Sequence, residues 1–143
     1  MPAAANIVIS DGAATPVAHT FSPIGQDSKG VWWYEQINPV PTNALGAKRL
    51  GIKVVRVMER NRLTGNAKVT ITVQNPTLET LGTKDSGLTP PPTVAYVNHA
   101  RVEFDYPERG SLQERKDTRA FVAALTSATG PILSVIENLN PVY

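Results

Sequence analysis

The chain has 143 residues, of which 41% are hydrophobic and 18% are charged, and 14 lysines and arginines against 12 aspartates and glutamates give a formal net charge of +2. This length suits one domain with its own core, and so small a charge favours a nucleic-acid partner only weakly. The chain has no cysteine and only two histidines, which excludes disulfides, thiolate catalysis and Cys-based zinc sites and argues against a His-rich metal site.

The N-terminal residues predict a β-hairpin. Residues 6–10 form a short apolar run, Asp11 and Gly12 favour a turn, and residues 17–21 can return beside the first strand. The opening MPAAANIVIS lacks the basic start and the long apolar run of a signal peptide. Nothing later approaches the roughly 18 apolar residues of a membrane span. We therefore expect a soluble protein that is made in a cytoplasm.

The segment VWWYEQ, residues 31–36, is the next predicted strand and follows the predicted loop PIGQDSKG. Its two tryptophans must face opposite sides if the segment is extended. We expect one of them in the core; the other either contacts a partner or is a partly covered surface residue. Residues 37–47 contain Pro39 and Pro41, so they predict a loop that leads into the main sheet.

Three later segments, residues 49–61, 67–74 and 93–106, alternate apolar and polar residues with the period of two that half-buried strands show. The expected apolar face carries Val69, Ile71, Val73, Tyr96, Ala100, Val102, Phe104 and Tyr106. The expected polar face carries Lys68, Thr70, Thr72, His99, Arg101, Glu103 and Asp105. Such a sheet needs a cover on its apolar face only.

The first of these three segments is ambiguous because Val54 and Val55 are adjacent apolar residues. A one-residue slip would move every side chain to the other face. We assign Val55 and Val57 to the core and Arg56, Met58 and Arg60 to the polar face.

The connection of residues 75–92, NPTLETLGTKDSGLTPPP, has no strong pattern. It exceeds the usual loop length, which predicts either a functional or a disordered loop. The three prolines at 90–92 stiffen its return into the last strand, and one of them could be cis.

Past Pro107 the period of the pattern becomes helical. Residues 111–129 predict a helix that starts with a capping box of Ser111 and Glu114, and Gly130 and Pro131 separate it from a second, short helix. The order predicts an α+β fold in one domain of residues 1–143, with a hairpin in 1–23, a main antiparallel sheet in 31–106 and two helices and a tail in 111–143. One sheet and two modest helices leave apolar surface uncovered, so we expect self-association.

These segments, in this order and spacing, resemble the coat proteins of the single-stranded RNA bacteriophages, the leviviruses. The resemblance covers nearly the whole chain and rests on IVISDG, GVWWYE, AKVTITVQNP, HARVEFDYP and GPILSVIENLNPVY. It implies an N-terminal hairpin, a five-stranded antiparallel sheet and two C-terminal helices. It also implies an intertwined homodimer whose edge strands pair, and a T=3 icosahedral capsid of such dimers around the RNA genome in the virion, assembled in the cytoplasm of a bacterial host. The loop of residues 75–92 would then adopt more than one conformation at the symmetry axes.

The resemblance further implies that the polar face binds an RNA hairpin and that the protein represses translation of the replicase. By matching position, the RNA-binding residues would be Lys68, Thr70, His99 and Arg101, with Thr72 on the same face and with Arg56 and Arg60 on the assigned register. Lysine and arginine neutralise phosphates, threonine forms hydrogen bonds, and an imidazole can stack on an unpaired base. His99 stands where the family commonly has tyrosine, and Arg101 replaces a smaller polar residue, so the resemblance leaves the RNA sequence open.

Other interpretations remain open at this point. Each polar residue could simply be solvated, and His99 could pair with Glu103. Glu103 and Asp105 could act as an acid–base pair in an enzyme, but no nucleophile or phosphate-binding loop accompanies them. A cellular RNA-binding module with a sheet platform is the alternative function, and it would show aromatic residues on the open face. We predict a capsid protein, not an enzyme, with no cofactor, membrane or small-molecule substrate.

Overall fold

The computed structural model describes residues 4–56, 65–82, 87 and 90–142. The chain divides into two compact units, which are described separately. The first comprises Met1–Arg56 and Ala67–Asp105, and the second comprises Val57–Asn66 and Tyr106–Tyr143.

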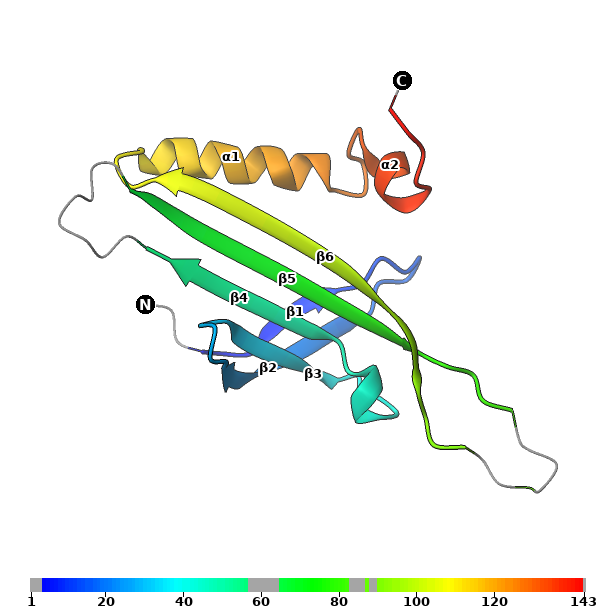
Figure 1. The fold of residues 1–143 in the computed structure, drawn as a ribbon. Coiled ribbons are helices and arrows are strands. Elements are labelled where there is room, and N and C mark those ends of the chain that lie inside the picture. Colours follow the sequence, from blue (N-terminus) through cyan, green and yellow to red (C-terminus); the bar gives the residue numbers. More distant parts are fainter. Residues whose placement is uncertain (1–3, 57–64, 83–86, 88–89, 143) are drawn as a thin grey trace. The chain divides into compact units, whose positions relative to one another are not determined.

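The sheet contains six strands in chain order, each beside the next (Figure 1). Their bounds are Ile7–Ser10 (β1), Ala18–Gln26 (β2), Trp32–Asn38 (β3), Arg49–Val55 (β4), Asn66–Leu78 (β5) and Val94–Pro107 (β6), with a short 3₁₀ helix at Ala44–Gly46 (η1). The antiparallel sheet followed by two helices is confirmed. The strand count differs from the expected five, because the hairpin strands β1 and β2 continue the same sheet through the pairing of β2 with β3.

Strand β2 runs further than the sequence pattern indicates. It includes Pro23 to Gln26, which we predicted as loop. Two register shifts interrupt its pairing with β3, between Thr20 and Phe21 and between Pro23 and Gly25, and Gly25 has a φ of 134°. A bulge accommodates a proline that cannot donate to the ladder and a glycine whose backbone other residues rarely adopt.

The pairing of β4 with β5 fixes which residues share a face. Leu50, Ile52 and Val54 are partners of Val73, Ile71 and Val69, whereas Gly51, Lys53 and Val55 are partners of Thr72, Thr70 and Lys68. The assignment of Val55 to the core is therefore wrong, because Val55 lies beside Lys68 on the polar face. The observed register of β4 differs from the predicted one by one residue, so its residues lie on the faces opposite to those predicted. Arg56 follows the last residue of β4 and does not belong to the paired set.

The core of the first unit lies where β1 to β4 pack their apolar side chains together. Phe21 is 2% exposed, Tyr34 and Leu50 are also buried, and Ile7 and Ile52 pack against this cluster. Tyr34, and neither tryptophan, is thus the core aromatic residue of β3, because Trp32 is 43% exposed and Trp33 lies on the other face of the strand. Val54 and Val73, on the same face as Leu50, stay exposed in the single chain.

Asp11 organises the turn of the N-terminal hairpin. Its carboxylate accepts hydrogen bonds from the backbone N–H groups of Val17 (2.9 Å) and Ala13 (3.2 Å), and it lies 3.1 Å from Nε2 of the buried His19. The bond from Val17, followed by those from His19 and Ala13, lowers the pKa of Asp11 from 3.8 to about 2. These partners confirm the predicted turn at Asp11 and Gly12.

Acid should destabilise the fold through Asp11. Because the pKa is lower in the folded chain, the ionised carboxylate stabilises the fold fully above pH ~4, and this contribution is lost as the pH falls through the folded value of about 2. We expect the thermal midpoint of Asp11→Asn to fall less steeply between about pH 5 and about pH 2 than that of the wild type. Parallel pH curves for the two proteins would contradict this role.

The second unit contains both helices, Leu112–Leu125 (α1) and Leu133–Glu137 (α2). The predicted capping box is confirmed, because the Ser111 hydroxyl accepts from the Glu114 N–H and the Glu114 carboxylate accepts from the Ser111 N–H. The helix ends at Leu125, earlier than the expected residue 129, where the hydroxyls of Thr126 and Ser127 donate to carbonyls of the last turn. No helix in the described residues is long and apolar enough to cross a membrane.

Candidate nucleic-acid interface

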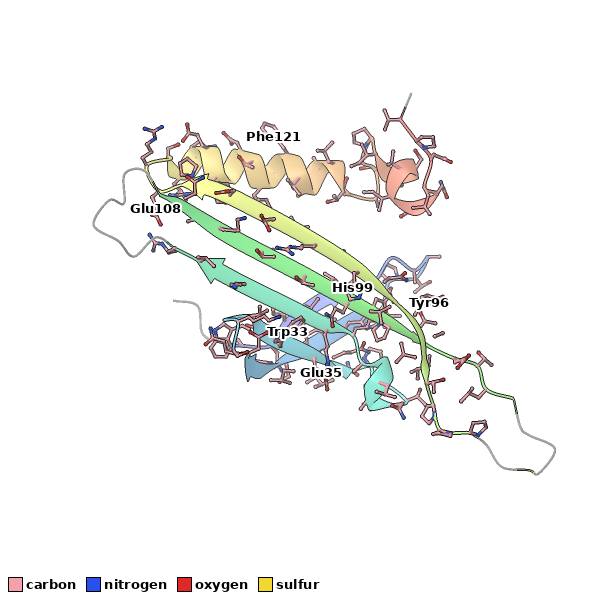
Figure 2. All side chains as sticks on the ribbon, viewed as in Figure 1. Trp33, Glu35, Tyr96, His99, Glu108 and Phe121 are labelled. Atoms are coloured by element: carbon pink, nitrogen blue, oxygen red, sulfur yellow. The ribbon has the colours of Figure 1, made fainter. Side chains whose placement is uncertain are left out.

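One face of the sheet gathers polar side chains from three neighbouring strands, and we call it the polar face. Its polar side chains are Lys53 from β4, Lys68, Thr70 and Thr72 from β5, and His99, Arg101, Glu103 and Asp105 from β6, and Gly51 and Val55 of β4 lie on the same face. The members from β4 and β5 are register partners. Glu103 contacts Lys68 across the strands, and alternation along β6 places His99, which Figure 2 labels, on the side of Glu103.

Three charged side chains form the centre of the polar face. The Glu103 carboxylate lies 2.6 Å from Nζ of Lys68 and 2.8 Å from Nη2 of Arg101. Hydrogen bonding to Glu103 raises the pKa of Lys68, and hydrogen bonds from Lys68 and then Arg101 lower the pKa of Glu103. Lys68 and Glu103 are therefore charged at neutral pH. The two cations remain accessible, with Lys68 44% and Arg101 66% exposed, so they can also reach phosphate oxygens.

This arrangement bears on two earlier interpretations of Glu103, as a partner of His99 and as a general acid in an enzyme. The partners of the Glu103 carboxylate are Lys68 and Arg101. A carboxylate engaged by two cations is also poorly placed to act as a general acid, since its pKa is lowered and not raised. Among the described residues, no group of three or more His, Cys, Asp or Glu side chains could hold a metal ion.

The structure brings together most of the residues that the sequence marked as a site. Lys68, Thr70, Thr72, His99 and Arg101 share the polar face. Arg56 lies outside this set, because it follows Val55, the last paired residue of β4, and Val55 is the one on the polar face. Arg60 lies outside the described residues.

Lys53 belongs to the polar face but was not among the predicted residues. It pairs with Thr70, beside the partners Val55 and Lys68. Its cationic side chain adds to those of Lys68 and Arg101. The correct register of Val54 and Val55 would have identified Lys53, because its place two residues before Val55 fixes its face.

Strand β3 extends the polar face with an aromatic residue and an ion pair. Trp33 pairs with Gly51, and Glu35 pairs with Arg49, whose Nη2 lies 2.8 Å from the Glu35 carboxylate (Figure 2). The predicted face held no tryptophan, so Trp33 is an addition to it. The tryptophans do face opposite sides, as expected, and Trp33 is the one on the polar side.

The comparisons with known proteins agree on one family. The family model described as Levivirus coat protein matches residues 2–143. The virus-like particle of bacteriophage ESE058 is 40% identical with a TM-score of 0.86, and the match covers 99% of this chain and 100% of that one. A search of the curated proteins finds no match.

Two further solved structures have a similar fold. The virus-like particle of bacteriophage NT-214 is 25% identical with a TM-score of 0.81, covering 99% of this chain and 100% of that chain. The capsid protein of bacteriophage GA is 18% identical with a TM-score of 0.72, covering 99% of both chains, and at that identity the likeness concerns the fold alone.

Proposed function

The chain belongs to the levivirus coat protein family, and from this premise we propose that it dimerises, assembles into an icosahedral shell and holds single-stranded RNA on the polar face. The observation that carries the proposal is the match over residues 2–143 together with a face that presents Lys53, Lys68 and Arg101 side by side with hydroxyls. Family membership confirms that the chain is not an enzyme. It also rules against the alternative of a cellular RNA-binding module.

The exposed apolar side chains support the dimer. Val54 is 58% exposed and Val73 is 36% exposed in the single chain, although both lie on the face that contains the core. Strand β6 is the last strand of the sheet, so one of its edges is available for pairing. A second copy that pairs along β6 would extend the sheet and remove that edge, and covering the apolar face would remove the exposed valines from water.

The loops would form the contacts of the proposed shell, and the polar face would hold its RNA. Dimers would contact one another through loops, including the connection between β5 and β6, whose conformation would differ between positions in a T=3 shell. The polar face, opposite the apolar one, would look inward at the genome. Cationic side chains would neutralise phosphates, while Thr70 and Thr72 would donate hydrogen bonds. The same face would bind an RNA hairpin and thereby repress translation of the replicase.

Removing a cation from the polar face should weaken RNA binding while dimers persist. We expect Lys68→Ala or Arg101→Ala to lower affinity for RNA and to reduce the slope of log K against log salt by about one, because one phosphate contact is lost. Filter-binding titrations at several salt concentrations measure both quantities. The matched control is Lys116→Ala, which removes the same charge from helix α1 instead of from a sheet strand. Unchanged affinity in either variant would remove that residue from the site.

Removing the central carboxylate should have the opposite effect. Glu103 occupies donors of both Lys68 and Arg101 and places a negative charge among phosphates. Glu103→Gln keeps the shape of the side chain and leaves both cations for RNA, so we expect tighter binding and a steeper salt dependence in the same titration. Weaker binding of Glu103→Gln would mean that the carboxylate's positioning of the two cations matters more than its charge.

A further inference from the structure

Trp33 is held in a fixed place on the polar face. Its indole Nε1 donates to Oδ2 of Asp27 at 2.9 Å. The other carboxylate oxygen of Asp27 accepts from the backbone N–H groups of Lys29 and Val31, both at 2.9 Å. The turn between β2 and β3 therefore fixes Asp27, and Asp27 fixes the indole. A side chain anchored in this way loses little further rotamer freedom when it binds something.

Gly51 is the neighbour that makes this placement possible. A Cβ at Gly51 would come within 3.0 Å of Cζ3 and 3.1 Å of Cη2 of Trp33 and within 3.1 Å of Cγ1 of Val31, so the outer edge of the indole ring lies against Gly51. The register puts Trp33, Gly51 and Thr72 in one row across β3, β4 and β5. With strand spacings of about 4.8 Å, Trp33 and Thr72 stand about 10 Å apart at their backbones, and the edge of the indole reaches over Gly51 between them.

We propose that Trp33 is a stacking platform for an unpaired base of single-stranded RNA, with Thr72 beside the base and Lys53 neutralising a neighbouring phosphate. The inference rests on the proposed RNA-holding function and deepens it by naming a base-binding site on β3. Every base has a π-face, so the site takes bases without reading their sequence, as a shell that packages a whole genome requires. Lys53 is two residues from Gly51 on the same strand face, which brings its ammonium group to the same part of the sheet.

Fluorescence of Trp33 itself tests the proposal. In full-length Trp32→Phe, Trp33 is the only tryptophan of the chain. We expect a short oligoadenylate to quench its emission saturably in unassembled protein, at the concentrations that give RNA retention on filters. In Trp33→Phe the remaining Trp32 lies on the other face and should respond little. RNA retention with unchanged Trp33 emission would overturn the stacking site and leave the proposed function standing.

Affinity measurements supply the second arm. We expect Trp33→Leu to weaken oligoadenylate binding by about tenfold, Trp33→Phe to weaken it less, and Trp32→Leu to leave it unchanged. The salt slope should stay at the wild-type value in all three, in contrast to Lys68→Ala, because no phosphate contact is lost. Equal affinity of Trp33→Leu and wild type would overturn the platform. If the wild type binds no RNA at all, the stacking site and the RNA-holding function are both wrong.

Discussion

Val102→Asp is expected to leave no soluble dimer. Val102 lies on β6 between Arg101 and Glu103, which point to the polar face, so alternation places it on the apolar face. It is half-buried in the single chain and would be fully buried if a second copy covers that face. Burying an unpaired carboxylate there costs several kcal/mol, roughly the whole stability of a marginal association.

Sedimentation of purified protein measures this effect. Thr72→Asp is the matched control, because it adds the same charge on the polar face and should leave the dimer intact while weakening RNA binding. Circular dichroism shows whether Val102→Asp retains its strands as a monomer or loses them. A normal dimer of Val102→Asp would contradict the assignment of the faces of β6.

Phe21→Ala is expected to lower the free energy of unfolding by about 3–5 kcal/mol. Phe21 is the most buried core residue described, at 2% exposure, and it joins Tyr34, Leu50 and Ile7 across four strands. Truncation removes the apolar contacts and leaves a cavity that the sheet fills only in part. Because the total stability of a domain is about 5–15 kcal/mol, this loss is a large fraction of it.

Urea unfolding of wild type and variant at one protein concentration measures the loss, since association contributes to stability. Val40→Ala is the comparison variant, because Val40 is 82% exposed in a loop and its truncation should change stability by less than about 0.5 kcal/mol. A loss below about 1 kcal/mol for Phe21→Ala would show that the cluster around Phe21 is not the core.

The sequence pattern predicted the late strands well and the first main strand badly, for a physical reason. Along β5, every second residue is apolar over Val69, Ile71 and Val73, so only one register buries them. In β4 the adjacent Val54 and Val55 fit either face. The pairing with β5 decides between them, and that information lies outside the strand itself.

The candidate site shows the same division. Lys68, Thr70 and Thr72 follow from the alternation within β5, whereas Lys53 depends on the register of β4 against β5. Trp33 was recognised as a residue opposite Trp32, but nothing local to VWWYEQ shows that Tyr34 would be buried and that Trp33 would find an anchor in Asp27. Side-chain hydrogen bonds of this kind form only once the turn between β2 and β3 has formed.

The most direct test of the coat protein account is to express this chain alone in bacteria, purify the largest assembled fraction and examine it by electron microscopy together with its ultraviolet absorbance ratio. We expect uniform round shells whose absorbance shows packaged RNA. Free dimers or monomers without particles and without RNA would contradict autonomous assembly and the holding of RNA on the polar face.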